Sequence, residues 1–284
     1  MSGGGTAGGN ERQIAYWNEV AGPKWIRVQA AMESRLTAVE DRLLERAAPR
    51  AGERVLEVGC GTGTTTARLA GLVGEGGHVT AVDVSRPMLE AARARLAGLA
   101  QVTLMEADAA FATFAAPFDL VTSRFGVMFF EDPAAAFANL RASLVPGGRL
   151  VCAAWGPIAD NPHWSVPLEI TVARLGPPKP RRPHAPGPLA FADRDHARTV
   201  LTQAGFAEIA IEPERVMLSG RSLDDEAEMA GTMGPAGALI DEKEADAQTR
   251  AALRVAFREA LPGYADADAW LPATIHMITA RNLA

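Results

Sequence analysis

The sequence predicts an α/β protein built on a mostly parallel, Rossmann-like sheet, and two observations support this. Short apolar runs alternate with helical patterns between residues 53 and 155. The first run, Arg54–Val58, leads directly into a turn with glycine at alternate positions. These glycines are Gly59, Gly61 and Gly63, and a helical pattern follows them. A strand, a glycine-rich turn and a helix form the nucleotide site of open α/β sheets, at the carboxyl end of the first strand.

Composition and charge narrow the function classes. The 284 residues carry a formal net charge of −6, which argues against the basic surface of a nucleic-acid-binding protein. Cys60 and Cys152 fall in apolar elements, so they are expected to be core residues and not a disulfide framework. No run of about 18 apolar residues and no signal-peptide core occur, so the sequence predicts a cytoplasmic protein without a membrane span. No spacing typical of a metal site is present.

Composition also divides the chain into segments. Five of the first nine residues are glycine, and nine of the 19 prolines lie between Pro157 and Pro188. Proline interrupts strands and long helices. We expect a disordered tail over residues 1–10, a helical cover over 11–52 and a nucleotide-binding core over 53–155. A proline-rich lid beside the binding site is expected over 156–192, and the end of the sheet with its helices over 193–284.

The helical cover is predicted to contain one long amphipathic helix. From Trp25 the apolar positions recur in steps of three and four as far as Leu43, and Pro49 and Gly52 then end the helix. The aromatic residues Tyr16 and Trp25 have two interpretations. They are either core residues or parts of a lid that folds over the carboxyl edge of the sheet and contacts a ligand.

Further strands are predicted in the core, at residues 77–84, 101–106, 117–123 and 149–155. The helix after the first strand is expected to be capped by Thr62 or Thr64, and the helix after the second by Ser85. The helix before the fifth strand is expected to include Leu144 and to end at Pro146-Gly147-Gly148. The later part of the chain predicts helices over 166–175, 193–204, 224–233 and 241–261 and strands over 207–218 and 270–280.

The spacing of the glycines distinguishes two kinds of nucleotide. A dinucleotide fingerprint, G-x-G-x-x-G, needs a further glycine three residues after the second. Counted from Gly59 and Gly61 that position is Thr64, and counted from Gly61 and Gly63 it is Thr66. Asp83 ends the predicted second strand, where an acid can accept hydrogen bonds from both ribose hydroxyls. Capping the next helix is its alternative role. The sequence therefore favours a ribose-containing ligand other than NAD(P).

The stretch Glu57-Val58-Gly59-Cys60-Gly61-Thr62-Gly63 resembles the first motif of class I S-adenosylmethionine (SAM)-dependent methyltransferases. Residues 118–130 resemble the branch related to ubiquinone- and menaquinone-biosynthesis C-methyltransferases, which are methyltransferase type 11-like. The likeness covers residues 14–155 well and the rest loosely. It implies SAM as the cofactor and a seven-stranded sheet whose last strand lies antiparallel between the fifth and sixth.

The resemblance also implies a cofactor site. The glycine turn and the following helix would hold the methionine part of SAM, Asp83 the ribose and Asp108 the adenine amino group, although Asp108 is also an ordinary turn residue. The residues expected to contact the cofactor are Tyr16, Trp25, Glu57, Gly59, Cys60, Gly61, Thr62, Gly63, Asp83, Val84, Met88, Ala107, Asp108, Ala109, Ser123, Arg124 and Phe125.

The acceptor pocket is expected beside this site, lined by Met128, Phe129, Trp155 and Trp164. His163 is either the general base or an incidental loop residue. Methyl transfer from a sulfonium is one in-line displacement, in which positioning contributes about 7–11 kcal/mol and a base about 10²–10⁴-fold. The lack of an evident base therefore does not argue against methyl transfer.

The sequence thus predicts an enzyme that moves a methyl group from SAM to the O, N or C atom of a small, apolar or aromatic molecule. Asn161-Pro162 is not the N-P-P-Y motif of nucleic-acid N-methyltransferases, because it follows the fifth strand and not the fourth. Two alternatives stay open: an NAD(P)-dependent oxidoreductase, and a SAM-binding sensor or accessory subunit without turnover. The expected partner is the small-molecule acceptor, and a homodimer is also compatible with the sequence.

Overall fold

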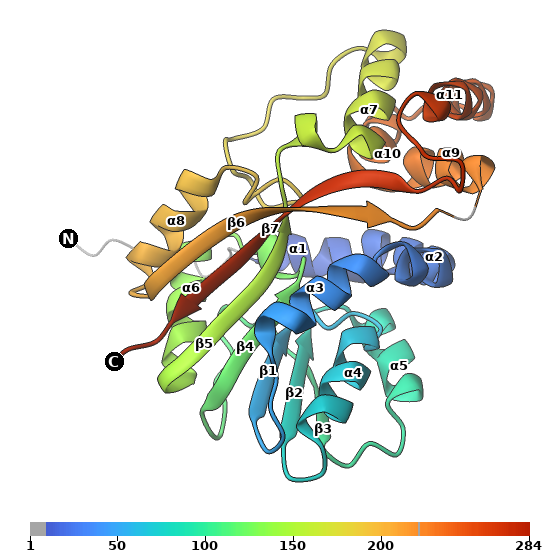
Figure 1. Ribbon diagram of the computed structural model, residues 1–284. Coiled ribbons are helices and arrows are strands. Elements are labelled where there is room, and N and C mark those ends of the chain that lie inside the picture. Colours follow the sequence, from blue (N-terminus) through green and yellow to red (C-terminus); the bar gives the residue numbers. More distant parts are fainter. Residues whose placement is uncertain (1–9, 221) are drawn as a thin grey trace.

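The computed structural model describes residues 10–220 and 222–284, so the predicted tail lies, apart from Asn10, outside the described residues. Seven strands form one sheet in the order β3-β2-β1-β4-β5-β7-β6 (Figure 1). Strands β1 to β5 pair in parallel, whereas β7 is antiparallel to β5 and β6, which confirms the predicted fold class. In chain order, β1 to β7 cover Arg54–Val58, His78–Asp83, Val102–Glu106, Phe118–Arg124, Leu144–Trp155, Ala207–Leu218 and Leu271–Arg281.

The start of β5 corrects one prediction. Leu144 and Pro146–Gly148 belong to this strand and not to the end of the preceding helix, α6 (Pro133–Ala142). The reason is pairing with the chain beyond β7. The Gly147 N–H donates a hydrogen bond to the carbonyl of Asn282, whose side-chain amide donates to the Leu144 carbonyl. This long-range pairing keeps the Pro-Gly-Gly segment in the strand, although Gly147 has a positive φ of 78°.

The helical cover is broken into more pieces than predicted. It consists of α1, a π-helical turn, α2 and α3, over Glu11–Tyr16, Trp17–Ala21, Gly22–Arg35 and Thr37–Ala47. The single helix expected from Trp25 to Leu43 is therefore wrong, because the chain breaks at Leu36, a buried residue. The Thr37 hydroxyl donates to two carbonyls of the preceding turn, which competes with regular helical bonding. The apolar period continues across the break and hides it.

The later helices correct two further predictions. Helix α7 is longer than expected, because Pro162 lies in its first turn, where proline is tolerated, and Pro167 is accommodated inside it. The helix expected over 241–261 is two helices, since Asp246 accepts a hydrogen bond from the Thr249 N–H and caps a new helix there. Helices α4, α5 and α7 to α11 cover Thr64–Val73, Arg86–Arg95, Pro162–Leu175, Arg194–Gln203, Leu223–Thr232, Gly234–Glu242 and Ala247–Ala260.

Two predicted caps also have other roles. Gly63 occupies the N-cap of α4 in a left-handed conformation, so neither Thr62 nor Thr64 caps this helix. The Thr62 hydroxyl instead donates to a glutamate on α2. Ser85 occupies the N-cap of α5, but its hydroxyl donates to the carbonyl of Trp17. Both hydroxyls therefore tie the core to the helical cover.

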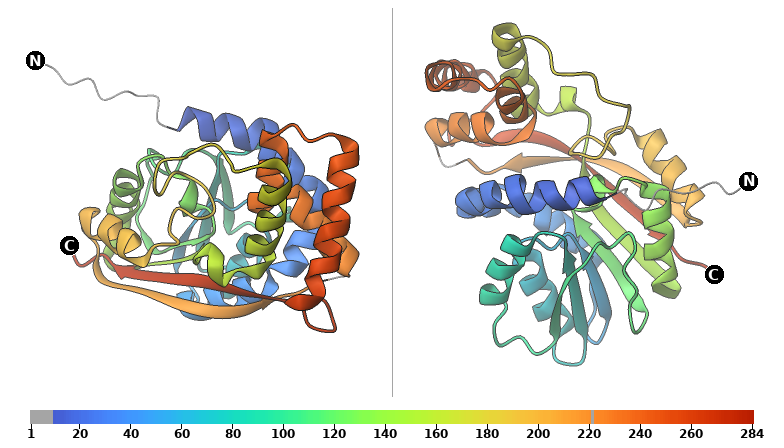
Figure 2. Two further views of the ribbon diagram at one scale, coloured as in Figure 1. Left: turned by 90° about the horizontal axis from the view of Figure 1, so that it is seen from above. Right: turned by 180° about the vertical axis from the view of Figure 1, so that it is seen from behind.

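Two groups of helices lie at the carboxyl edge of the sheet. Helices α1 and α2 lie across the ends of the core strands, and α7, α9, α10 and α11 gather above the far ends of β6 and β7 (Figure 1; Figure 2). Across residues 10–220 and 222–284, no helix has both the length and the apolar character that a membrane span requires. The same residues contain no group of three or more His, Cys, Asp or Glu side chains placed to hold a metal ion.

Candidate active site

The turn between β1 and α4 brings the backbone unusually close to its neighbours. Gly59, Gly61 and Gly63 have positive φ angles of 69°, 55° and 78°. A Cβ on Gly59 would lie 2.7 Å from the Gly126 Cα, and one on Gly61 would lie 2.9 Å from the Met88 Cε. Only glycine tolerates both the positive φ angles and these short distances to neighbouring atoms. Because Gly63 offers no side chain, the first N–H groups of α4 stay free to bind an anion.

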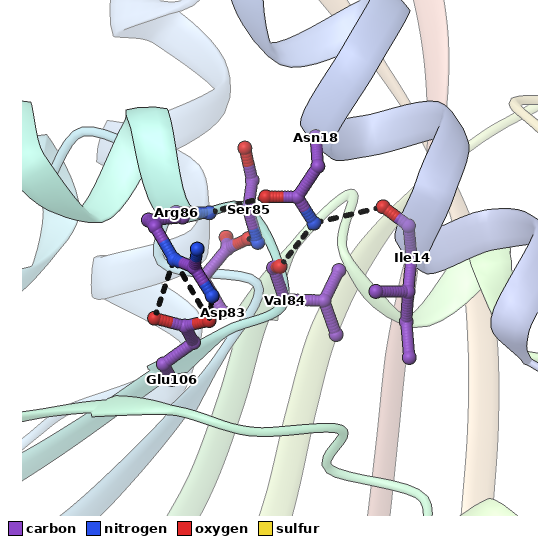
Figure 3. Close-up of polar contacts among 7 residues, drawn as sticks. All are labelled: Ile14, Asn18, Asp83, Val84, Ser85, Arg86 and Glu106. Carbon is purple, nitrogen blue, oxygen red and sulfur yellow. Dashed lines mark hydrogen bonds and ion pairs between the residues drawn. The ribbon is translucent and has the colours of Figure 1, made fainter.

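Asp83 lies at the end of β2, beside this turn (Figure 3). Its Oδ2 accepts a 2.7 Å hydrogen bond from the Gly61 N–H, and its Oδ1 accepts a 2.8 Å bond from the Ser85 N–H. Burial raises the pKa of Asp83 above its ordinary value, although the backbone donors oppose the rise. Each carboxylate oxygen keeps a second acceptor site, so the side chain can still accept two hydroxyl groups.

The loop after β3 holds a second carboxylate, Asp108. Its Oδ1 accepts a 2.9 Å hydrogen bond from the Ala110 N–H, and its Oδ2 accepts a 2.7 Å bond from the side-chain amide of Asn10. The Ala107 N–H donates to the carbonyl of Asp83, so the two acids lie on neighbouring strand ends. Asp108 therefore accepts an NH₂ group in the structure, which is the donor chemistry that a purine amino group offers.

Asn18 fastens the helical cover to the end of β2 (Figure 3). Its side-chain nitrogen donates to the carbonyls of Ile14 and Val84, both at 2.8 Å, and its oxygen accepts a hydrogen bond from the Arg86 N–H. One side chain thus joins three elements: the cover, the end of β2 and the start of α5. The cover is therefore held directly over the strand that ends in Asp83.

A row of aromatic rings leads away from the glycine turn. Phe125 follows β4 with a φ of +67°, a strained value for a residue with a side chain. Its ring stacks on Trp155 with centroids 4.3 Å apart, and Trp155 lies 5.4 Å from the His163 ring and 4.6 Å from the Trp164 ring. We call Phe125, Trp155, His163 and Trp164 the aromatic row. Trp155 and His163 are 6% and 4% exposed, so the rings of the row pack mainly against one another.

Comparison with known proteins agrees with this geometry. Residues 55–148 match a family described as the methyltransferase domain. A demethylmenaquinone methyltransferase of Clavibacter sepedonicus is 45% identical over 105 residues, which are 37% of this chain and 42% of that protein. Nocamycin O-methyltransferase of Saccharothrix syringae is 32% identical over 182 residues, 60% of this chain and 65% of that protein. This chain thus spans only part of the length of these relatives.

Solved structures share the fold of this chain. Phosphoethanolamine N-methyltransferase 2 of Haemonchus contortus, in complex with phosphomonomethylethanolamine and S-adenosylhomocysteine, aligns with a TM-score of 0.57 and 18% identity, over 96% of this chain and 60% of that one. The [4+2]-cyclase SpnF aligns with a TM-score of 0.51 and 21% identity, over 86% of this chain and 80% of that one. At such identities the likeness concerns the fold alone.

Most predicted cofactor residues of the methyltransferase domain gather around the glycine turn and the ends of β2 and β3. Glu57 lies beneath the turn, where its Oε2 accepts a 2.6 Å hydrogen bond from the Thr66 hydroxyl and so joins β1 to α4. Burial raises the pKa of Glu57 to about 7. Met88 lies in the first turn of α5 and its Cε faces Gly61. The others at these strand ends are Gly59, Cys60, Gly61, Thr62, Gly63, Asp83, Val84, Ala107, Asp108 and Ala109.

The end of β4 supplies two more predicted residues with different surroundings. The Ser123 hydroxyl donates to the Val58 carbonyl and accepts from the Gly126 N–H, so this side chain fixes the loop to β1. Arg124 is different, since its Nη1 is buried without a hydrogen-bond partner among the residues described. Burial lowers the pKa of Arg124, and nearby glutamates such as Glu57 oppose this. Arg124 can therefore bind an additional anionic group.

The two aromatic residues singled out in the helical cover have different surroundings. Tyr16 is 46% exposed on α1, and Trp25 packs against the core. Trp17 instead packs edge-on against Phe129, with ring centroids 5.0 Å apart. Trp17 and Asn18 were missed, although they adjoin Tyr16 and an aromatic residue beside an asparagine is a weak signal of a contact. Nothing local marked Asn10 as the partner of Asp108.

The proline-rich segment borders the predicted acceptor residues. The Gly187 N–H donates a 3.0 Å hydrogen bond to the carbonyl of Met128, which is itself buried. On β7, the Nδ1 of His276 lies 3.0 Å from the Phe191 carbonyl, which agrees with a structural role for that histidine. The structure thus brings Met128, Phe129, Trp155 and Trp164 to the same side of the sheet as this segment.

His163 is buried within the aromatic row, with 4% of its surface exposed. Neither ring nitrogen has a hydrogen-bond partner in the described part of the chain. Burial, and next the charge of Arg35, hold the pKa of His163 well below its usual value, although the nearby backbone of Pro272 opposes this shift. The folded protein therefore keeps this imidazole neutral at physiological pH.

We expect His163→Phe to make the protein less sensitive to acid. In wild type, the unfolded chain binds a proton at His163 below about pH 6.5 whereas the folded chain does not, so stability falls as pH decreases. The free energy of unfolding of wild type should drop relative to the variant by about 1.4 kcal/mol per pH unit below this value. Urea unfolding of both proteins at pH 7.5 and 5.5 measures this difference. Parallel pH profiles would contradict the neutral, buried imidazole.

Proposed function

We propose that this chain is a SAM-dependent methyltransferase that transfers a methyl group by in-line displacement to the O, N or C atom of a small, apolar or aromatic molecule. The observation that carries the proposal is the junction of the glycine turn with Asp83. There a backbone that only glycine can form meets a carboxylate with two unused acceptor sites. The matched methyltransferase family and the curated methyltransferases support the same reaction class.

The residues of the crevice fit the parts of SAM. The free N–H groups of α4 and the cationic Arg124 suit its methionine carboxylate, and Asp83 suits the ribose hydroxyls. Asp108 suits the adenine amino group, which would share or replace the amide of Asn10. When bound, SAM supplies an electrophilic methyl group on a sulfonium. The remaining work of the protein is to hold the acceptor in line and exclude water.

The aromatic row and the covering helices serve these two tasks. In this proposal the half-buried Phe125, held in place by its stacking on Trp155, contacts a planar acceptor, while Trp17 on Phe129 closes the side nearest the cover. Positioning of this kind contributes about 7–11 kcal/mol, which exceeds the contribution of a general base. His163 stays a candidate base only for an acceptor whose reacting group extends beyond Trp155.

We expect Asp83→Ala to weaken SAM binding at least tenfold in calorimetry, because the ribose loses its acceptor. Glu106→Ala is the matched control. Glu106 pairs in register with Asp83 at the end of β3, but its carboxylate binds Arg86 at 2.9 Å, outside the crevice. The control should bind SAM as wild type does, and thermal unfolding should verify that both variants fold. Unchanged affinity of Asp83→Ala would contradict the ribose assignment.

Turnover needs its own test, because the cyclase SpnF shares the fold. Labelled SAM incubated with the protein and a metabolite extract should yield S-adenosylhomocysteine and a labelled small molecule. Binding of SAM without any labelled product would favour a sensor or accessory subunit. The register of the glycines argues against NAD(P), and the absence of NADH binding in a fluorescence titration would agree with this.

A further inference from the structure

Helix α1 is the loosely attached part of the helical cover. None of its six residues is buried, although it lies across the ends of the core strands (Figure 1; Figure 2). Two polar contacts join this end of the cover to the core: the hydrogen bond from Asn10 to Asp108, and an ion pair of 3.6 Å between Arg12 and Glu131. The Arg12 side chain is 83% exposed, so the ion pair holds the helix only weakly. The Asn10 contact is therefore the stronger of the two.

The π-helical turn that follows α1 is firmly anchored. Asn18 in this turn bonds both the end of β2 and the start of α5, and the Ser85 hydroxyl donates to the Trp17 carbonyl at 3.0 Å. A Cβ on Gly22 would lie 2.6 Å from the Ser85 Oγ, so the backbone of the cover lies directly against the core there. Turns of this kind are rare and occur frequently at functional sites. The chain is thus fixed from residue 17 onwards, and α1 projects from a fixed point.

The side chain of Asn10 carries the same pair of hydrogen-bonding groups as one edge of an adenine, an NH₂ donor beside an acceptor. The NH₂ group donates to the Asp108 Oδ2 at 2.7 Å. The acceptor, Oδ1 of Asn10, is buried and has no hydrogen-bond partner in the part of the chain that the structure describes. A buried acceptor without a partner makes this arrangement less stable than a fully bonded one. Asn10 therefore occupies the place beside Asp108 but is not bound there as well as its groups allow.

The cofactor of the proposed reaction needs the same carboxylate. Asp108 Oδ1 already accepts from the Ala110 N–H, and Oδ2 accepts from Asn10. Asn10 is only 9% exposed, so its amide, and not solvent, lies against Oδ2. An adenine amino group must come within about 3 Å of that oxygen to form a hydrogen bond. The base and the Asn10 amide therefore compete for one position.

We infer that Asn10 is an internal competitor of the cofactor, and that α1 is a flap which the empty protein keeps closed and the bound cofactor opens. This rests on the proposed methyltransferase function. The adenine takes Asp108, Asn10 is released, and α1 turns away from the crevice about the anchored π-helical turn. Isolated helices shorter than about 12–15 residues are marginal in water, so the released α1 unwinds. The closed flap lowers the apparent affinity for the cofactor by the fraction of molecules in which it is open.

Hydrogen exchange of the full chain, with and without S-adenosylhomocysteine, tests the direction of the movement. The Ile14 N–H, which donates to the Asn10 carbonyl, reports on α1, and the amides of α2 report on the anchored part of the cover. Saturating ligand should speed exchange in α1 at least fivefold, whereas exchange in α2 should not become faster. In Asn10→Ala, α1 should exchange rapidly even without ligand. A cover that closes over the ligand, or an adenine that shares Asp108 with Asn10, would instead leave α1 equally or better protected.

Calorimetry gives a second readout that does not depend on exchange. Asn10→Ala should bind S-adenosylhomocysteine about fivefold more tightly than wild type, because the competitor is gone. Arg12→Ala, on the same helix, removes only the exposed ion pair and should bind as wild type does. Because α1 buries no residue, both variants should fold.

Two results would overturn the inference: α1 that exchanges no faster with ligand, and Asn10→Ala that binds the ligand no better than wild type. The failure of the proposed function would look different. In that case S-adenosylhomocysteine would not bind to wild type or to Asn10→Ala. If it binds to both with equal affinity, only the flap role of α1 fails.

Discussion

Gly59→Ala should nearly abolish SAM binding, with a loss of at least a hundredfold in calorimetry. The new Cβ would lie 2.7 Å from the Gly126 Cα, and both partners are backbone, so neither can rotate away. The φ of 69° adds strain of its own. Relief requires the turn after β1 and the loop after β4 to separate, which displaces the free N–H groups of α4. Stability should fall by about 3 kcal/mol in urea unfolding.

Gly98→Ala separates the clash from the strain. Gly98 has a φ of 89°, yet a Cβ there would meet nothing within 4 Å. This control should lose only about 1 kcal/mol of stability and should bind SAM as wild type does. If Gly59→Ala also behaved in this way, the close approach of the turn to Gly126 would have no importance for the site.

Glu226→Ala should be among the most destabilising single substitutions in the chain, with a loss of about 3–5 kcal/mol, because it leaves the charge of Arg35 buried without a partner. Glu228→Ala is the matched control on the same helix. The Glu228 side chain is 62% exposed and pairs with an equally exposed Arg254, so its loss should cost less than about 1 kcal/mol. Chemical denaturation of the three proteins compares these values.

The double variant Arg35→Met, Glu226→Leu tests why the pair is present. We expect the double variant to recover wild-type stability, because no unpaired charge remains. It should still bind S-adenosylhomocysteine. A double variant as unstable as Glu226→Ala would show that the pair is needed for packing.

Local patterns were sufficient for the core of the fold. Arg54–Val58 and Ala207–Leu218 were predicted to the residue, because apolar strands bounded by turns carry their signal within a few positions. The break at Leu36 was missed because an apolar stripe continues through a one-residue interruption. The start of β5 at Leu144 depends on pairing with Asn282, which lies far away in the sequence. Such pairing leaves no local pattern.

The candidate site also contains some residues that local patterns predict and others that depend on long-range contacts. The glycine turn and Asp83 were predictable, since backbone conformation and strand ends dictate their residue types. The contact of Asn10 with Asp108 and the pairing of Arg35 with Glu226 join residues about 100 and 190 positions apart. A buried arginine looks like any other arginine in the sequence. Only the fold shows that the Tyr264 hydroxyl and the His163 ring nitrogens are buried without partners among the described residues.

A crystal structure of the full chain with S-adenosylhomocysteine tests the central claim most directly. We expect the ribose hydroxyls within hydrogen-bonding distance of Asp83, the amino-acid carboxylate at the start of α4, and the adenine beside Asp108. The sulfur should face Phe125. A ligand bound elsewhere, or no ligand beside Asp83 at saturating concentration, would contradict the account.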